Sequence, residues 1–229
     1  MSAFFNAEDG YYSITKAGII TLIALIAVLV ILTAFISSRE HENTKKKSIF
    51  STKQLVFCAV LLALGFATSF VKIIKLPLGG SVTLCSMLFI TLIGYWYGPK
   101  IGLICGVAYS ILQFIQDGGS YVLSPLQACL DYFFAFTALG VSGFFYKKKN
   151  GLYIGYIVAI LARGLFHTLG GYLYWMDYMP ESFPKSLSFI YPFVYNYSFI
   201  LLEGIITLII LLLPPVKKAL SSGKKLATQ

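Results

Sequence analysis

The sequence has little charge, and acidic side chains are especially few. Only 12% of its 229 residues are charged, with nine Asp and Glu against eighteen Lys and Arg, whereas a soluble domain averages about 25%. This scarcity excludes an ordinary water-soluble domain. The 58% hydrophobic composition and the mean hydropathy of +0.79 instead indicate a membrane protein. Several apolar stretches reach about 18 residues or more, which is enough to cross a bilayer as a helix.

Motifs of several other protein classes are also missing. The four cysteines lie singly within apolar runs, without metal-ligand spacing, and are typical of small buried side chains. No Walker A motif or other nucleotide fingerprint occurs, and no His/Asp/Glu spacing indicates a metal or catalytic cluster. The net charge of +9 is divided among short clusters between apolar runs, which is a topology signal. We therefore expect no cofactor, no metal and no nucleic-acid partner.

The apolar runs predict an all-α membrane protein with seven spans. The first, Gly18–Ile36, has neither the basic flank nor the cleavage pattern of a signal peptide, so we interpret it as a retained helix. Residues 1–53 would then form an extra N-terminal transmembrane helix with a basic linker, and residues 54–229 a six-helix bundle. The six later spans are approximately Gln54–Val71, Val82–Tyr97, Ile101–Ile115, Tyr121–Phe145, Leu152–Trp175 and Phe189–Leu213.

Basic residues gather in alternate loops, which predicts the orientation. The clusters lie at 39–53, at Lys100, at 147–149 and at 217–225. Because short loops rich in Lys and Arg stay in the cytoplasm, these four regions should lie inside the cell. The expected protein therefore passes several times through the cell membrane, with its N-terminus outside and its C-terminus in the cytoplasm.

Asp131 is a carboxylate inside the apolar run that ends at Phe145. A charge at membrane depth costs roughly 2.5–3.5 kcal/mol on insertion scales, so it normally faces a partner or a cavity. Tyr132 stands beside it, and Gln127 lies one helical turn earlier on the same face. We interpret Asp131 as part of a site for a small cationic solute. The alternative is a buried polar group that only joins two helices.

Three polar side chains from three predicted helices lie at similar depth. At 1.5 Å per helical residue, Asp131, His167 and Asn196 lie about 15, 12 and 10 Å below the outer helix ends. Together with nearby aromatic residues they predict a polar cavity that opens outward. Taken singly, the aromatic residues fit an interfacial belt, and His167 or Asn196 fit helix–helix hydrogen bonding. The aromatic residues are Tyr121, Tyr132, Trp175, Tyr191 and Tyr195.

Two further charges are predicted to lie deeper in the bundle. Arg163 falls about 18 Å and Glu203 about 21 Å below the outer ends of their helices. Their similar depth predicts that they pair with each other, outside the ligand site. Arg163 also stands one turn below His167, so the alternative is that it reaches toward Asp131.

From about Thr52 onward, the chain resembles the thiamine-specific S component of energy-coupling factor (ECF) transporters. The resemblance lies in GGSVTL at 79–84, YVLSPLQACLDYFFAFTALGVSGFF at 121–145, RGLFHTLGGYLYW at 163–175 and YPFVYN at 191–196. It covers all six later helices in order and implies a thiamine site near the outer face. The residues that it assigns to this site are Tyr121, Asp131, Tyr132, His167, Gly171, Trp175, Tyr191 and Asn196.

The chemistry of these residues suits thiamine. Its thiazolium ring carries a permanent positive charge, which Asp131 can offset in a cavity of low dielectric constant. Trp175 offers an aromatic face for stacking or a cation–π contact, worth about 2 kcal/mol when desolvated. The aminopyrimidine needs both donors and acceptors, and Asn196 supplies both, with Tyr191 and His167 nearby.

The first family-like helix carries small residues at Ala59, Ala63 and Ala67. This spacing makes a smooth face that another helix can approach closely, although alone it more often serves internal packing. The resemblance implies that the face docks onto a membrane coupling subunit, which works with two cytosolic ATPases. It also implies that loop 72–81 is the outer gate. Two features depart from the family pattern, namely the extra N-terminal helix and Glu203.

Three alternatives remain at this point, of which a receptor or an assembly protein is the weakest. An S component for another vitamin or for a thiamine precursor such as hydroxymethylpyrimidine would have the same fold. A precursor without the thiazolium would have less use for Asp131 together with Trp175. An intramembrane enzyme could use Asp131 and His167 as acid and base, but the sequence offers no metal cluster to accompany them.

Overall fold

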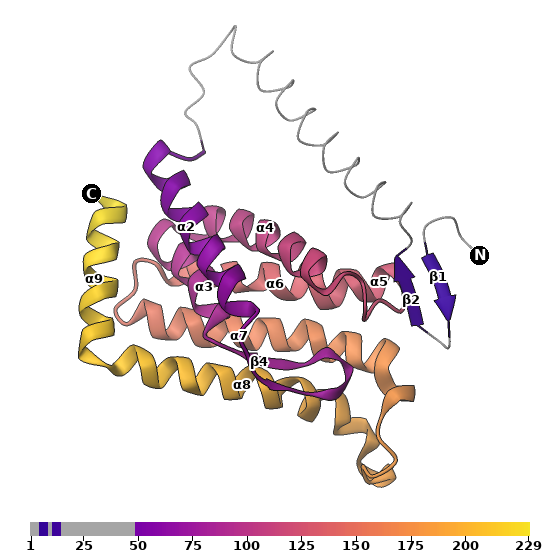
Figure 1. Cartoon of the computed structure of the whole chain (residues 1–229). Coiled ribbons are helices and arrows are strands. Elements are labelled where there is room, and N and C mark those ends of the chain that lie inside the picture. The colour runs from indigo at the N-terminus through magenta and orange to yellow at the C-terminus, as the bar shows by residue number, and fades with distance from the viewer. Residues whose placement is uncertain (1–4, 9–10, 15–48) are drawn as a thin grey trace, which may run out of the picture.

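The computed structural model describes residues 5–8, 11–14 and 49–229. Near the N-terminus, β1 (Phe5–Glu8) and β2 (Tyr11–Ile14) pair as an antiparallel hairpin. The predicted helix Gly18–Ile36 lies outside the described residues, so the expected total of seven spans stays a prediction. From Ile49 onward the chain forms a bundle of helices that lie roughly side by side (Figure 1).

Each of the six later predicted spans contains a helix, although Val82 and Thr83 of the second span belong to a β-strand and its helix begins at Ser86. The first three are α2 (Thr52–Ser69), α3 (Ser86–Tyr97) and α4 (Pro99–Asp117). The fourth contains α5 (Pro125–Ala128), a π-helical turn (Cys129–Phe134), α6 (Ala135–Thr137) and a 3-10 segment (Ala138–Phe145). The fifth contains α7 (Gly151–Gly170), a π-helical turn (Gly171–Trp175) and a 3-10 turn (Met176–Tyr178). The sixth is a 3-10 segment (Lys185–Ile190) followed by α8 (Tyr191–Leu212).

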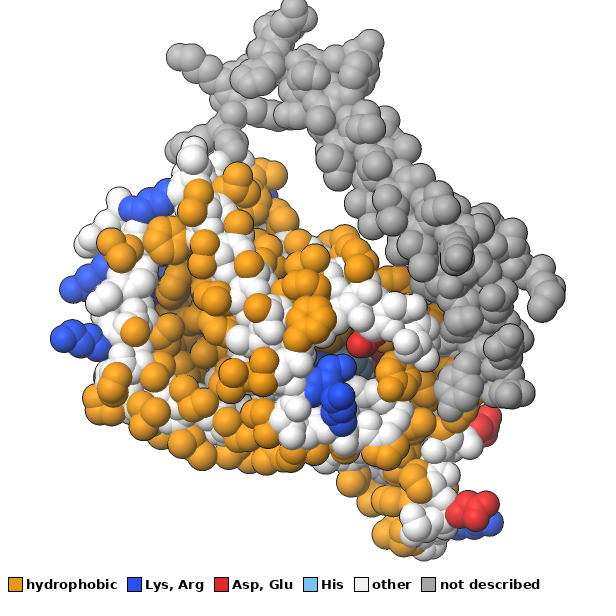
Figure 2. Space-filling view, in the orientation of Figure 1, with side chains coloured by type: hydrophobic (Ala, Val, Ile, Leu, Met, Phe, Trp, Pro, Cys, Tyr) orange, Lys and Arg blue, Asp and Glu red, His pale blue; other side chains and the backbone are white. Residues whose placement is uncertain are grey.

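The bundle has the length and the surface of a membrane protein. Four described helical segments, Thr52–Ser69, Pro125–Phe145, Gly151–Tyr178 and Lys185–Leu212, are long and apolar enough to cross a bilayer. Helix α3 is apolar but shorter, and α4 carries the polar residues Gln113 and Gln116. Figure 2 shows a broad apolar surface over the side of the bundle. This surface suits contact with lipid tails, so we treat the protein as spanning the membrane.

The centre of the bundle is the segment Ala138–Phe145, which packs against α3, α4 and α7. Small residues make this close packing possible. A Cβ atom added to Gly140 would lie 2.4 Å from the carbonyl oxygen of Gly102 on α4, and one added to Gly94 would lie 2.4 Å from Ser142 Oγ. Membrane helices commonly use small residues in this way to bring backbones together.

A tight turn at residues 97–100 joins α3 to α4. Gly98 adopts a φ of 89°, which a residue with a side chain rarely adopts, and Pro99 starts the next helix at its first position. Helix α4 therefore begins directly after α3, with only Gly98 between them.

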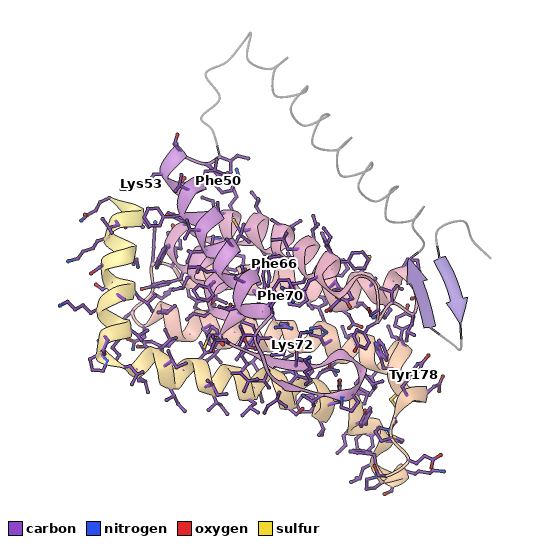
Figure 3. All side chains as sticks on the ribbon, viewed as in Figure 1. Phe50, Lys53, Phe66, Phe70, Lys72 and Tyr178 are labelled. Carbon is purple, nitrogen blue, oxygen red and sulfur yellow. The ribbon has the colours of Figure 1, made fainter. Side chains whose placement is uncertain are left out.

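The predicted outer loop 72–81 contains a β-hairpin. Strands β3 (Lys72–Lys75) and β4 (Ser81–Thr83) pair antiparallel, with a 3-10 turn at Pro77–Gly79 between them. We call residues 72–83 the gate hairpin. It lies beside α8 in Figure 1, and Figure 3 shows Lys72 at its start.

An element absent from the sequence prediction is α9 (Pro214–Thr228). It lies across one end of the bundle, beyond the end of α8 (Figure 1). Its apolar side packs on α3, where Gly223 faces Trp96 and Lys224 lies 4.0 Å from the ring centre of Tyr95. Tyr97 donates a hydrogen bond to the carbonyl oxygen of Ala227. The lysines of α9 therefore lie at the same end of the bundle as the start of α2 and the α3–α4 turn.

Candidate functional site: a polar cavity around Asp131

A cavity with an empty volume of about 980 Å³, including its opening to solvent, lies between the gate hairpin and helices α4 to α8. Its lining combines charged, amide, hydroxyl and aromatic side chains, as is usual for small-molecule sites. Every residue that the sequence assigned to the ligand site lines this cavity. These residues are Tyr121, Asp131, Tyr132, His167, Gly171, Trp175, Tyr191 and Asn196.

Asp131 is the acceptor at the centre of this site. Its Oδ2 accepts hydrogen bonds from Gln127 Nε2 at 2.5 Å and from Trp175 Nε1 at 3.0 Å, and its Oδ1 lies 3.3 Å from His167 Nδ1. The side chain is 13% exposed, which leaves it desolvated on most sides but open to the cavity. The donors hold the carboxylate in one orientation. The predicted proximity of Gln127 to Asp131 is confirmed as a direct hydrogen bond.

A guanidinium completes this chain of polar groups. Arg163 Nε donates to His167 Nε2 at 3.3 Å. Because arginine has no acceptor, the Nε2 atom of His167 must carry the lone pair, and its Nδ1–H then donates to Asp131. Arg163 also lies 4.3 Å from the ring centre of Phe136. The histidine thus links a buried cation to the carboxylate, which lowers the cost of placing both charges at membrane depth.

Asp131 and Trp175 both lie in π-helical turns. Asp131 is within Cys129–Phe134, and Trp175 ends Gly171–Trp175. A π-helical turn is rare, often occurs at functional sites, and rotates the residues that follow relative to a regular α-helix. Here the two irregular turns come from neighbouring helical segments and their side chains meet in a hydrogen bond. The bundle therefore departs from regular helix geometry at the residues best suited to bind a cation.

Asn196 and Gly171 lie together in the cavity wall, where α8 meets the end of α7. Asn196 uses both amide hydrogens within the protein, donating to the carbonyl oxygens of His167 at 3.2 Å and Pro192 at 2.8 Å. It can therefore offer a ligand only its side-chain oxygen as an acceptor. The expectation that Asn196 also supplies hydrogen-bond donors to the ligand is wrong. A Cβ atom on Gly171 would lie 2.7 Å from Pro192 Cβ and 3.2 Å from Asn196 Nδ2, so only glycine fits there without displacement.

Tyr132 and Tyr121 connect the cavity wall to the gate hairpin. Tyr132 is buried and donates to Asp117 Oδ2 at 3.1 Å. Asp117 in turn lies 3.8 Å from the ammonium of Lys72 on the gate hairpin. Tyr121 packs its ring against Gly79 at the hairpin turn. The hairpin is thus joined to the ligand wall through an ion pair and an aromatic contact.

The prediction that Arg163 and Glu203 pair with each other is wrong. In the described part of the chain, the Glu203 carboxylate accepts from the backbone N–H of Thr83 at 2.8 Å and from its hydroxyl at 2.7 Å. Arg163 instead follows the alternative, reaching Asp131 through His167. Both charges line the cavity, contrary to the expectation that they lie outside it. Equal depth did not pair them, because the Glu203 carboxylate bonds to Thr83 and Met87, and Arg163 bonds to His167.

Several cavity residues were not assigned to the site from sequence. Arg163, Gln113 and Gln116 also line it, as do the aromatic residues Phe136 and Phe199, whose rings flank His167 with centroids 6.2 Å away. The signal for Arg163 was its position one turn from His167. The phenylalanines carried no signal, since aromatic residues occur throughout the apolar runs.

The small-residue face of α2 points away from the bundle. Ala59, Ala63 and Ala67 are all exposed, and so are the neighbouring Val60 and Leu64. The alternative given above, that this spacing serves packing inside the bundle, does not apply to these three alanines. Their exposure leaves the face available for lipid or for another protein.

The fold and the cavity define a class of protein, a helical membrane bundle with a polar cavity between its helices. The chain belongs to the thiamine transporter protein family (Thia_YuaJ), whose sequence model matches residues 55–221. The resemblance seen in the sequence is therefore confirmed.

Individual relatives agree with this family. The chain is 31% identical over 153 residues to thiamine transporter ThiT of Bacillus subtilis, covering 61% of this chain and 77% of the relative. It is 27% identical over 145 residues to thiamine transporter ThiT of Lacticaseibacillus paracasei, covering 56% and 70%. A solved structure of ThiT from Listeria monocytogenes shares the fold, with a TM-score of 0.60, 24% identity and coverage of 76% of this chain and 96% of that chain.

Proposed function

We propose that this chain binds thiamine in the cavity around Asp131 and serves its uptake as the S component of an ECF-type transporter. Membership of the thiamine transporter family supports the substrate, and makes the chain a transporter protein and not an enzyme. The observation that carries the site is the Asp131 carboxylate, fixed by Trp175 and Gln127 and exposed to the cavity. The thiazolium cation would lie against this carboxylate and the indole of Trp175.

The other walls suit the uncharged parts of thiamine. The side-chain oxygen of Asn196 can accept from the exocyclic amine of the pyrimidine. Tyr191 and Tyr121 offer aromatic faces, and Gly171 lets Pro192 and Asn196 of α8 approach the cavity wall closely. A site that pairs each polar edge of its ligand rejects analogues that lack one, because its own buried groups are then left unpaired.

Calorimetry on the purified protein tests this proposal. Titrations would compare thiamine, its phosphates and hydroxymethylpyrimidine. We expect thiamine to bind much more tightly than the pyrimidine, because only thiamine carries the thiazolium charge. Tighter binding of the uncharged precursor would favour an S component for that precursor, and no binding of either would contradict the proposal.

The energy for uptake would come from partner proteins. No nucleotide-binding motif occurs in the sequence, so we propose a membrane coupling subunit and two cytosolic ATPases as partners. The exposed face of Ala59, Ala63 and Ala67 on α2 is the proposed docking surface for the coupling subunit. Residues 54–229 would form the binding unit, and residues 1–53 an additional membrane helix with its linker.

The proposed orientation places the gate hairpin outside and α9 in the cytoplasm. Lysines of α9 and Lys53 lie at one end of the bundle, as the labelled Lys53 and the position of α9 in Figure 3 indicate. The gate hairpin, whose residues line the cavity, lies toward the other end (Figure 1). By the positive-inside rule the lysine-rich end faces the cytoplasm, which puts the N-terminus outside and lets thiamine enter from outside the cell.

A further inference from the structure

The gate hairpin forms one wall of the cavity, and α8 contacts it at two places. Residues Leu78–Ser81 and Thr83 line the cavity. Near the turn, the hairpin is hydrogen-bonded to Tyr195, and at its base it is hydrogen-bonded to Glu203. Neither side chain has a role in the ligand contacts proposed above. Glu203 is also the residue that departs from the family pattern.

The contact near the turn consists of two neutral hydrogen bonds made by one hydroxyl. Tyr195 Oη accepts from the backbone N–H of Gly80 at 3.1 Å and donates to the carbonyl oxygen of Pro77. The phenol can lie this close because position 80 has no side chain. A Cβ atom there would lie 2.8 Å from Tyr195 Oη and 2.9 Å from the ring of Phe199. Pro77 and Gly80 lie on either side of residues 78–79 at the hairpin turn. The Tyr195 hydroxyl therefore fixes the position of this turn over the cavity.

The contact at the base is buried and uses a carboxylate. Glu203 is 2% exposed and accepts from the N–H and hydroxyl of Thr83, and from the N–H of Met87 at 3.3 Å. Met87 is in the first turn of α3, where Cys85 precedes the helix with a φ of 55° and gives no side-chain cap. The carboxylate of α8 thus takes the place of that cap and lies favourably at a helix N-terminus.

We propose that Glu203 and Tyr195 are positioning residues that hold the gate hairpin over the cavity. Glu203 is the fixed pivot, and the Tyr195 hydroxyl is the contact that breaks when the hairpin opens. The assignment follows from the two environments. Hydrogen bonds to a buried carboxylate are strong and costly to break, whereas two neutral bonds at a partly exposed hydroxyl exchange readily with water. Only the effect on thiamine kinetics rests on the function proposed above.

Hydrogen–deuterium exchange on the ligand-free full chain in detergent tests the Tyr195 contact. In Tyr195→Phe, exchange of the Gly80 amide should accelerate by about fivefold for one lost hydrogen bond and up to about thirtyfold for two. Exchange at Thr83 and Met87, which bond to Glu203, should stay within about twofold of the unsubstituted protein. A difference of this size from Gly80 shows that only the contact near the hairpin turn has loosened. Unchanged exchange at Gly80 would overturn this part of the proposal.

Tyr197→Phe is the matched control. Tyr197 lies two residues further along α8, and its hydroxyl donates to the carbonyl oxygen of Leu161 on α7 at 2.9 Å. This substitution removes one similar hydrogen bond without touching the gate hairpin. We expect no change in exchange at Gly80. An acceleration equal to that of Tyr195→Phe would mean that any loosening of α8 has the same effect, and would overturn the specific role of Tyr195.

Glu203→Gln tests the pivot. An amide keeps one acceptor oxygen but places an N–H group where the carboxylate accepts a hydrogen bond, so exchange at Thr83 or Met87 should accelerate. Equal exchange at both amides would contradict the pivot role. Should this variant fail to fold, Glu203→Asp, which keeps the acceptors on a shorter side chain, provides the same readout.

Stopped-flow fluorescence then connects the contact to function. We expect Tyr195→Phe to raise the thiamine dissociation rate by about fivefold or more, with no decrease in the association rate. An unchanged dissociation rate together with faster Gly80 exchange would show that the hairpin opens without controlling release, which contradicts the proposal. A wild-type chain that binds no thiamine would remove the proposed function, while the exchange result would still decide whether Tyr195 holds the hairpin.

Discussion

Replacing Asp131 by Asn removes the negative charge of the site and changes its shape very little. Asn keeps one side-chain oxygen, which can still accept from Trp175 and Gln127 as Asp131 Oδ2 does, and only the hydrogen bond from His167 Nδ1 is lost. The fold should therefore persist. The change separates the charge of the residue from its packing.

The expected loss of affinity follows from the surroundings of the carboxylate. Two unit charges about 4 Å apart attract by ~4 kcal/mol at an effective dielectric constant of 20. Arg163, linked through His167, already offsets part of the charge of Asp131. We therefore expect thiamine binding to weaken by ~2–4 kcal/mol, or roughly 30- to 700-fold in Kd, since 1.4 kcal/mol is tenfold.

Titration calorimetry with two ligands measures this effect. Thiamine should show the full loss, whereas the neutral hydroxymethylpyrimidine should change by less than about threefold, because it has no cation for the carboxylate to attract. A thermal unfolding scan in the same detergent would check that the variant is folded. Equal losses for the charged and the neutral ligand would refute the electrostatic reasoning.

Substitutions at three further positions probe the rest of the account. Trp175→Phe keeps an aromatic face but loses the hydrogen bond to Asp131, so thiamine affinity measured by calorimetry should fall less than in Trp175→Ala, for which we expect about 30-fold. Gly170→Ala would place a Cβ atom 2.5 Å from Asp131 Oδ1, and the displaced carboxylate should weaken binding about tenfold in the same assay. Ala63→Leu should leave binding of the purified protein unchanged but reduce uptake of labelled thiamine by cells, because it fills the exposed face of α2. Intact binding in both Trp175 variants, unchanged affinity in the glycine variant, or normal uptake in the alanine variant would each contradict the role given to that residue.

The helices could be predicted because apolar runs of fixed length report membrane spans directly. The predicted span Tyr121–Phe145 corresponds to helical residues 125–145, and Phe189–Leu213 to α8 with the 3-10 segment before it. The eight predicted site residues all line one cavity. They could be named from the sequence because the family resemblance gives the positions of the site residues as well as their identities. Periodicity alone would have missed this arrangement, since the π-helical turns at Cys129–Phe134 and Gly171–Trp175 break the regular helical repeat.

Depth along the helices was not enough to predict which side chains bond to each other. Arg163 and Glu203 have similar depths, but depth says nothing about the direction in which each side chain leaves its helix. The gate hairpin was missed because strands of four and three residues leave little trace in a sequence. Helix α9 was missed because its apolar side is only a few residues wide and its lysines were interpreted as loop charges.

The most direct measurement is an experimental structure of the complex with thiamine. It should show the thiazolium ring in the cavity between the gate hairpin and α7, close to the Asp131 carboxylate and within about 6 Å of the Trp175 ring. The aminopyrimidine should lie toward Asn196. Thiamine bound elsewhere, or an empty cavity at saturating thiamine, would contradict the account.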